Sequence, residues 1–184
     1  LAQTAEDHGM ADQRTAAANG IDIGTRLELF TDRFLIERLD GLALRLHPPQ
    51  PAPLARNPVR GAYMTVIKDG GLFRAYYRSY APGYTGPFHD GNPGEITCYA
   101  ESRDGHEWEF PDLNLREVPG LRPNHAILAG QPPFSHCFAP FLDTRPGVAP
   151  SQRYKALAGS HERGAIPGTG LHAFRSADGI RWEP

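Results

Sequence analysis

Apolar positions fall in short runs bounded by turn residues along two stretches of the chain. The first stretch holds such runs at residues 63–69, 73–79 and 95–102. In the second stretch, residues 137–143 and 154–160 have the same character. Short runs of this kind, separated by glycine, proline and aspartate, are typical of antiparallel strands. The pattern therefore predicts an all-β protein.

A repeated motif, S-x-D-G-x-x-W-E, ends both stretches. Its first copy contains Ser102, Asp104, Gly105 and Trp108, and its second contains Ser176, Asp178, Gly179 and Trp182, 74 positions later. Asp-Gly favours a tight turn, because glycine accepts a positive φ and aspartate bonds to the local backbone. The tryptophan supplies a large apolar side chain at the start of the next strand. One copy alone describes an ordinary hairpin, but two copies indicate a structural repeat.

The repeat extends upstream of the motif. Residues 63–69 correspond to 137–143 at the same offset of 74, and residues 73–79 correspond to 154–160 at an offset of 81. The second copy has seven extra residues in its first hairpin and a shorter second loop. Each unit, over about residues 62–111 and 136–184, is predicted as three strands, an Asp-Gly turn and a fourth strand. Four antiparallel strands at a fixed period are typical of β-propeller blades.

The N-terminal region has a different character. Residues 1–24 are polar and alanine-rich, and we expect a flexible tail there, with the propeller part beginning at residue 25. Leu27 and Leu29, and then Leu42, Leu44 and Leu46, alternate with polar residues or alanine. This alternation predicts further strands, which we expect to complete the last blade. The chain begins with leucine and stops inside the second motif, so we expect a fragment whose remaining blades lie beyond it.

Composition narrows the function classes. Hydrophobic residues make up 40% of the chain, enough for a core, and the net charge of −2 with scattered arginines argues against a nucleic-acid partner. No apolar run approaches the roughly 20 residues that cross a bilayer, so no membrane partner is expected. Cys98 and Cys137 are expected to be separate thiols, and no motif has metal-ligand spacing, so neither a metal nor another cofactor is expected. The compartment stays open, with a secreted or periplasmic location compatible with the sequence.

The segments TVIKDGGLFRAYYRS, ITCYAESRDGHEWEFP, APFLDTRPG, RYKALAGS and GLHAFRSADGIRWEP carry a family resemblance. In this order they resemble the five-bladed β-propeller glycoside hydrolase superfamily, which contains families 32, 43, 68 and 130. The chain is most similar to bacterial proteins with a family 32 N-terminal-like domain, over residues 27–184. The resemblance implies a propeller with about two blades in this chain, acting on a glycan or oligosaccharide in the central tunnel.

The same resemblance implies carboxylates that perform the hydrolysis. Two of them are expected at positions that hold Tyr63 and Ala139 in this chain, and the usual acid would lie beyond Pro184. Glycosidic cleavage requires two carboxylates. Two functions therefore stay open: a glycoside hydrolase-like enzyme with no assigned catalytic residue, or a non-catalytic glycan-binding or interaction propeller.

Candidate substrate-binding residues gather at the predicted strand ends. They are Arg60, Tyr63, Arg78, Tyr80, Asn124, His136 and Asp143. Arginine and aromatic side chains bind sugars through paired hydrogen bonds and ring packing. Each has a structural alternative, namely a turn for Asp143 and its counterpart Asp69, and a polar loop for His136. Glu95 and Glu101 bracket the third strand and are interpreted as surface or inter-blade residues, and adjacent Tyr76 and Tyr77 are expected on opposite faces of one sheet.

Overall fold

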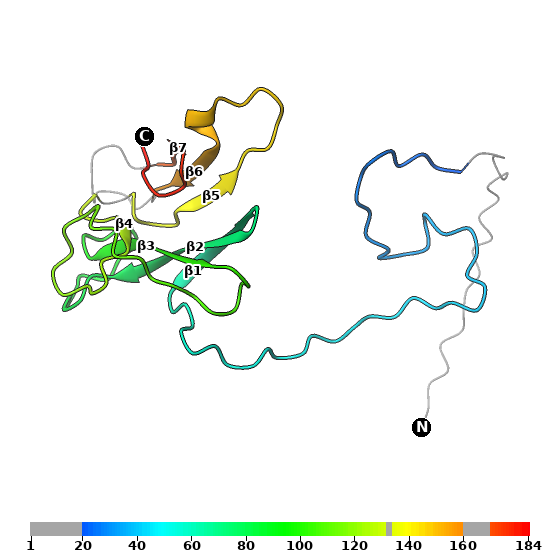
Figure 1. Ribbon diagram of the computed structural model, residues 1–184, viewed down its shortest axis with the longest axis horizontal. Coiled ribbons are helices and arrows are strands. Elements are labelled where there is room, and N and C mark those ends of the chain that lie inside the picture. The colour runs from blue at the N-terminus through cyan, green and yellow to red at the C-terminus, as the bar shows by residue number, and fades with distance from the viewer. Residues whose placement is uncertain (1–19, 132–133, 160–169) are drawn as a thin grey trace. The chain divides into compact units, whose positions relative to one another are not determined.

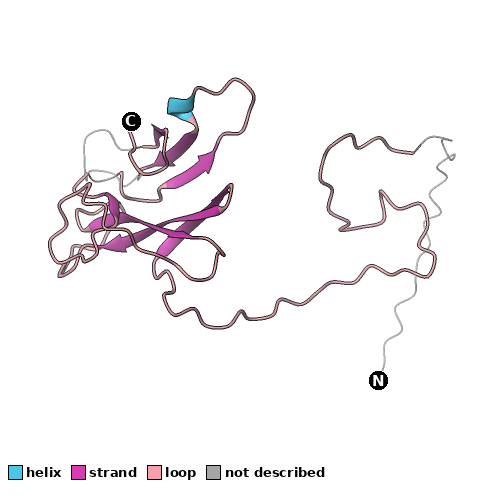
Figure 2. Ribbon diagram, in the orientation of Figure 1, coloured by secondary structure: helices cyan, strands magenta, loops and turns pink. Residues whose placement is uncertain are grey.

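The computed structural model describes residues 20–131, 134–159 and 170–184 (Figure 1). The chain divides into two compact units, residues 1–51 and residues 52–184. All strands of the described residues belong to the second unit, and the described part contains one short 3₁₀-helix and no α-helix (Figure 2). The prediction of an all-β protein is therefore confirmed at the level of fold class. The strands form two antiparallel sheets, and neither of them closes on itself.

The first sheet has the strand order β1-β2-β3-β4. Its strands are β1 (Ala62–Asp69), β2 (Leu72–Tyr80), β3 (Glu95–Ser102) and β4 (Ala126–Leu128). The first three agree with the sequence pattern to within one residue. The fourth position differs, because two separate segments pair with β3 there. Glu109 forms a single bridge with Glu101, and β4 pairs with Thr97 and Cys98. The loop between them leaves the edge and returns, so a strand forms between the two predicted repeat units, where none was predicted.

The second sheet has the order β5-β6-β7 and lies against one face of the first (Figure 1). Its strands are β5 (Ala139–Leu142), β6 (Tyr154–Ala158) and β7 (His172–Ser176). The extra residues of this unit form a hairpin loop that contains the 3₁₀-helix at Pro150–Gln152. As in the first sheet, the expected fourth strand is reduced to a single bridge, between Arg175 and Glu183.

Strand alternation divides the buried side chains into two groups. The inter-sheet core lies between the sheets and contains Ile67, Tyr76, Tyr99, Ile127, Leu128, Phe138, Tyr154, Ala156, Ala158, Phe174 and Trp182. The outer core lies on the other face of the first sheet and contains Ala75, Tyr77, Ile96, Cys98, Ala100, Trp108, Val118 and Ala126. Tyr76 and Tyr77 are thus buried on opposite faces, as expected. Cys98 and Cys137 are both free thiols.

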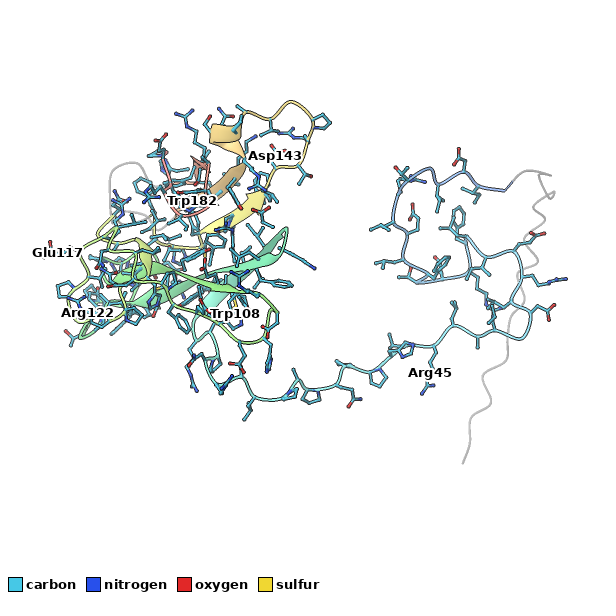
Figure 3. All side chains as sticks on the ribbon, viewed as in Figure 1. Arg45, Trp108, Glu117, Arg122, Asp143 and Trp182 are labelled. Carbon is cyan, nitrogen blue, oxygen red and sulfur yellow. The ribbon has the colours of Figure 1, made fainter. Side chains whose placement is uncertain are left out.

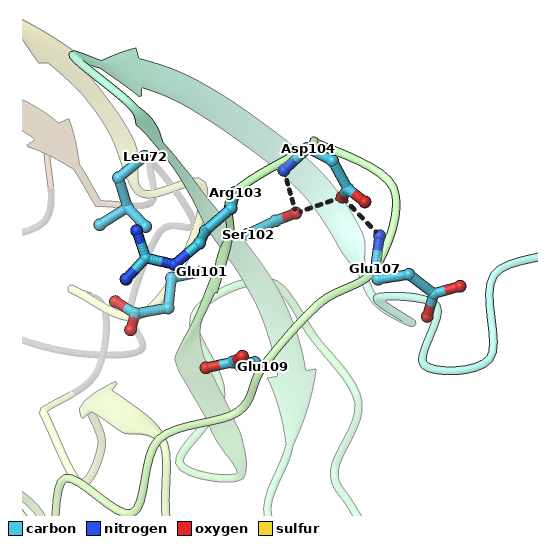
Figure 4. Close-up of a pocket in the computed structure, with 7 residues that line it drawn as sticks. All are labelled: Leu72, Glu101, Ser102, Arg103, Asp104, Glu107 and Glu109. Atoms are coloured by element: carbon cyan, nitrogen blue, oxygen red, sulfur yellow. Dashed lines mark hydrogen bonds between the residues drawn. The ribbon is translucent and has the colours of Figure 1, made fainter.

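Both copies of the repeated motif form the same turn. Ser102 Oγ accepts a hydrogen bond from Gly105 N at 2.9 Å, and Asp104 Oδ1 accepts bonds from His106 N and Glu107 N at 2.8 and 2.9 Å. Figure 4 shows the bond from Glu107 N to Asp104 and the contacts between Asp104 and Ser102. In the second copy, Ser176 and Asp178 accept the equivalent bonds at 2.9, 2.8 and 2.8 Å. Each Asp is followed by a glycine with φ of 76° or 75°, a conformation that disfavours a side chain.

The two motif tryptophans lie on opposite sides of the first sheet (Figure 3). Trp108 packs in the outer core, whereas Trp182 packs in the inter-sheet core against Phe138, with ring centroids 4.9 Å apart. Tyr76 donates a hydrogen bond of 2.9 Å to the carbonyl of Gly179. The second turn therefore helps to join the two sheets.

The predicted N-terminal strands are not formed, and this expectation was wrong. Residues 20–61 contain no strand, and Leu27 and Leu46 are 101% and 94% exposed. The other leucines of that pattern, Leu29, Leu42 and Leu44, are also exposed. A strand requires a hydrogen-bonded partner, and no described segment supplies one to these residues. Residues 1–19 of the expected tail lie outside the described residues.

Candidate functional site

Three charged or polar side chains meet where the two sheets approach each other. Arg78 lies on β2, Glu95 begins β3, and His136 lies in the loop that leads into β5. Arg78 Nη1 is 3.3 Å from Glu95 Oε1 and 3.0 Å from His136 Nδ1. His136 Nδ1 is in turn 2.9 Å from Glu95 Oε2. The side chains of Glu95, His136 and Arg78 are 1%, 8% and 15% exposed. We call these three residues the charged cluster.

Strand register explains why Arg78 and Glu95 meet. Tyr80 pairs with Glu95 and Arg78 with Thr97, so Arg78 and Glu95 lie on the same face of the first sheet, toward the second. Two backbone contacts position His136. Thr97 Oγ1 donates to the carbonyl of Ser135 at 3.3 Å, and Gly159 N donates to the carbonyl of His136 at 3.0 Å. Both sheets therefore hold the cluster in place.

The loop before β3 encloses the carboxylate of Glu95. Gly91 N and Asn92 Nδ2 donate to it at 3.3 and 3.4 Å. Asn92 is itself buried, and its Oδ1 accepts a bond of 2.9 Å from Gly94 N. A buried charge is tolerated only when it is paired and hydrogen-bonded. Arg78 and this loop together meet that requirement for Glu95.

Tyr63 and Asp90 form the exposed rim of the charged cluster. The Arg78 guanidinium carbon lies 4.3 Å from the centroid of the Tyr63 ring, in cation–π contact. Tyr63 is 60% exposed, so the ring extends from the buried cluster to the surface. The side chain of Asp90 is 54% exposed, and its Oδ2 lies 3.7 Å from His136 Nε2. An approaching ligand would meet these two side chains before the buried ones.

A group of three aromatic rings stands beside the cluster. Tyr80 stacks on Tyr84 with centroids 6.1 Å apart, and Phe88 meets both rings edge-on at 5.3 and 5.4 Å. Tyr80 pairs directly with Glu95, so the aromatic group adjoins the charged cluster. Gly94 lies under the Tyr84 ring, where a Cβ atom would come within 2.2 Å of ring carbon. Tyr80 and Phe88 remain 39% and 64% exposed.

The charged cluster and its rim together contain atoms of the kind that ligate metals. Asp90, Glu95 and His136 each place one ligand atom within 4.8 Å of the others, a convergence that the sequence did not indicate. However, the Arg78 guanidinium already lies within 3.3 Å of Glu95 and His136. A cation at this place would have to displace a charged group that satisfies the same carboxylate. The geometry thus fits an ion-pair network better than a metal centre.

The structure separates the sequence-predicted site residues. Tyr63, Arg78 and His136 come together, with Tyr80 beside them, and Arg60 is exposed just before β1. Asn124 and Asp143 do not join them.

Asn124 and Asp143 instead form hydrogen bonds that stabilise the local structure. Asn124 is buried, and its Nδ2 donates to the carbonyl of Arg116 at 2.7 Å. Asp143 accepts bonds from Arg145 and Lys155 at 2.7 and 2.6 Å, and these two partners hold the pKa of its carboxyl well below the ordinary value. Its repeat counterpart Asp69 accepts bonds from Arg153 and Tyr154, so it joins the two sheets rather than only forming a turn.

The position of Glu95 at the start of the third strand predicts a surface or inter-blade residue, and the structure decides between these two. Only 2% of Glu95 is exposed, so the surface alternative is wrong, whereas its place on the face toward the second sheet agrees with the other alternative. The sequence contained a usable signal: antiparallel pairing of residues 72–80 with 95–102 places Glu95 beside Arg78 on one face. Glu101, the other bracket of β3, is partly buried and accepts a 2.9 Å bond from Tyr99 Oη.

The chain was compared with family models, curated proteins and solved structures. No family model, no curated protein and no solved structure matches the chain. Among the described residues, no helix has the length and apolar character needed to cross a membrane.

Proposed function

We propose that the chain is a carbohydrate-active protein of the glycoside hydrolase-like propeller type, and that it binds a glycan at the charged cluster. In this proposal the two sheets are consecutive blades. The observation that carries it is the combination of a buried, positioned cluster with an exposed Tyr63 ring stacked on Arg78. The adjoining aromatic group extends the same surface.

The chemistry of the surface suits a sugar. Sugar hydroxyls both donate and accept hydrogen bonds, and the Asp90 carboxylate accepts them at the exposed rim. The apolar faces of sugar rings pack on aromatic side chains, which Tyr63, Tyr80 and Phe88 present. A mainly apolar surface with few positioned polar groups is typical of small-molecule sites.

Binding is favoured over hydrolysis by the state of Glu95. Cleavage requires one carboxylate as acid and another as nucleophile or base. Glu95 is buried and paired with Arg78, and both its carboxylate oxygens already accept hydrogen bonds, which keeps it from reaching a substrate. One observation keeps hydrolysis as the second candidate: carboxylate oxygens of Asp90 and Glu95 lie within 4.8 Å, close to the roughly 5 Å separation of retaining glycosidases.

A glycan panel tests the proposal. Binding of oligosaccharides would be measured by calorimetry or by NMR shifts for the wild type, Tyr63→Ala and Asp90→Asn. Phe30→Ala, another exposed aromatic truncation but in residues 1–51, is the matched control. We expect binding that both site variants weaken at least tenfold and that the control leaves unchanged. Binding unaffected by Tyr63→Ala, or no binding to any glycan, would contradict the proposed site.

A second assay separates the two candidate functions. Release of reducing ends from any bound glycan would be followed for the wild type and Asp90→Asn. Binding without release supports the non-catalytic function. Release that Asp90→Asn abolishes would establish hydrolysis and assign Asp90 a catalytic role.

A further inference from the structure

Arg78 uses only one nitrogen of its guanidinium group inside the charged cluster. Nη1 lies 3.3 Å from Glu95 Oε1 and 3.0 Å from His136 Nδ1, whereas Nε and Nη2 form no hydrogen bond with any described residue. Among the described residues, the buried side-chain atoms that lack a partner are Arg74 Nε and Ser135 Oγ. Because Nε and Nη2 of Arg78 are not among them, both nitrogens remain accessible. We call this side of the guanidinium the unused edge.

The unused edge carries two parallel N–H donors. Their spacing matches the two oxygens of a carboxylate, which an arginine binds with two hydrogen bonds at once. This chain contains an example of the same pairing, because Arg145 Nε and Nη2 lie 2.9 and 2.7 Å from the two carboxylate oxygens of Asp143. Glu95 contacts Arg78 only through Nη1 and leaves the equivalent edge open. The unused edge therefore has the geometry of a carboxylate receptor.

The surroundings of Arg78 hold its guanidinium in place before any ligand arrives. Glu95 and His136 fix Nη1, and the loop before β3 in turn holds Glu95. The Tyr63 ring covers one face of the guanidinium, with its centroid 4.3 Å from the central carbon. A side chain that is already fixed loses less conformational entropy when it binds a ligand. The unused edge is therefore preorganised.

The charges near Arg78 are balanced. Arg60 is exposed just before β1, and the first residue of β1 pairs with Arg78, so a second cation belongs to the same strand end. The rim carboxylate of Asp90 lies 3.7 Å from His136 and forms no ion pair with Arg78. The two arginines together offset the charges of Asp90 and Glu95. The site as a whole therefore does not repel an anionic ligand.

We infer that the glycan is acidic, and that the unused edge of Arg78 binds the carboxylate of one of its uronic acid residues. This inference rests on the glycan-binding function proposed above. The exposed part of the Tyr63 ring then packs on the same sugar residue, and Asp90 accepts a hydrogen bond from a sugar hydroxyl. A neutral sugar would leave the two N–H donors of the edge without a charged acceptor, so it would bind more weakly.

Matched pairs of oligosaccharides test the inference on the wild-type chain. Trisaccharides of galacturonate, glucuronate and mannuronate would each be compared by calorimetry with their carboxyl-reduced counterparts. Reduction converts the carboxylate into a hydroxymethyl group and keeps the stereochemistry of the ring. We expect at least one uronate to bind at least about tenfold more tightly than its neutral counterpart, as a charge-assisted bidentate pair predicts.

A conservative variant assigns this preference to the unused edge. Arg78→Lys keeps a positive charge beside Glu95 but has no second pair of donors, so the preference should fall below about threefold. Arg103→Lys is the matched control, because Arg103 is exposed and follows the opposite end of β3 from Glu95. This control should retain the full preference. Circular dichroism and thermal melting verify that both variants are folded.

NMR provides a readout that does not depend on a variant. In the wild type, the Nε–H resonance of Arg78 should move when the uronate is added and should stay in place when the reduced counterpart is added. A resonance that ignores the uronate, or an acidic preference that Arg78→Lys leaves intact, would overturn the inference.

The same measurements separate this inference from the function on which it rests. Equal binding of acidic and neutral glycans that Tyr63→Ala still weakens would overturn the carboxylate assignment and leave glycan binding in place. Failure of every acidic and neutral oligosaccharide to bind would overturn the proposed function itself.

Discussion

Tyr63 and Cys137 share a left-handed backbone conformation, with φ of 50° and 49°, at equivalent positions of the two units. They stand 74 residues apart, at the repeat offset. Left-handed conformations are costly for residues with a side chain. In the first sheet the register shifts between Ala62 and Thr65, around Tyr63. The strained residue re-aims the chain at the mouth of the charged cluster, so that the Tyr63 ring covers Arg78.

The shared conformation predicts opposite effects of two substitutions at Cys137. Cys137→Gly should leave stability unchanged or raise it by up to about 1 kcal/mol, because glycine adopts a positive φ without steric cost. Cys137→Val should lower it by about 1–2 kcal/mol, because a β-branched residue is poorly tolerated there. Urea unfolding of the two variants measures the difference. Equal midpoints for the glycine and valine variants would contradict a left-handed residue at this position.

The bond from Tyr76 to the Gly179 carbonyl predicts a measurable link between the sheets. Tyr76→Phe removes the buried hydroxyl and should lower the free energy of unfolding by about 1 kcal/mol. Tyr63→Phe removes a hydroxyl from a ring that is 60% exposed and should change it by less than about 0.5 kcal/mol. Denaturant unfolding compares the two. A similar small effect of both substitutions would show that the inter-sheet bond contributes nothing.

The first Asp-Gly turn predicts a component of acid sensitivity. Backbone N–H groups of His106 and Glu107 lower the pKa of Asp104 to about 2. Because this pKa is depressed in the folded state, the stabilisation is present above the unfolded value of about 4 and is lost as the pH falls toward 2.

Asp104→Asn, which keeps a side-chain oxygen acceptor but cannot titrate, isolates this component. The variant should lose less stability than the wild type between pH 4 and pH 2, as measured by thermal melting across that range. Parallel pH profiles for the two proteins would argue that the Asp104 carboxylate is not bonded as described.

The charged cluster predicts strong coupling between Glu95 and Arg78. Glu95→Gln leaves the guanidinium without its buried counter-charge and should lower stability by about 3 kcal/mol. The double variant Glu95→Gln with Arg78→Met removes both charges, so its loss should be clearly smaller than the sum of the two single losses. A double-mutant cycle in urea measures this coupling. Additive losses would mean that the two side chains do not form a buried pair in solution.

Local signals in the sequence predicted much of this fold. The bounds of β1, β2 and β3, both Asp-Gly turns and the burial of Tyr76 and Tyr77 on opposite faces all follow from alternation and turn chemistry. Such features depend on residues that are close together in the chain, so they can be predicted from the sequence. The repeat offset also relates equivalent positions in the structure, because both units follow the same local rules.

The tertiary structure alone decided which residues form the site and which strands exist. Glu95 is buried, Asn124 and Asp143 hold neighbouring backbone and side chains, and β4 lies between the two predicted repeat units. The leucines of residues 27–46, in contrast, have no strand partner among the described residues. Each outcome depends on a segment far away in the sequence that supplies a charge, a backbone group or a strand edge. The alternation of side chains along a strand predicts which face of the sheet a side chain lies on. Only the meeting of the two sheets determines what it faces, because burial and pairing energies arise from contacts between distant segments.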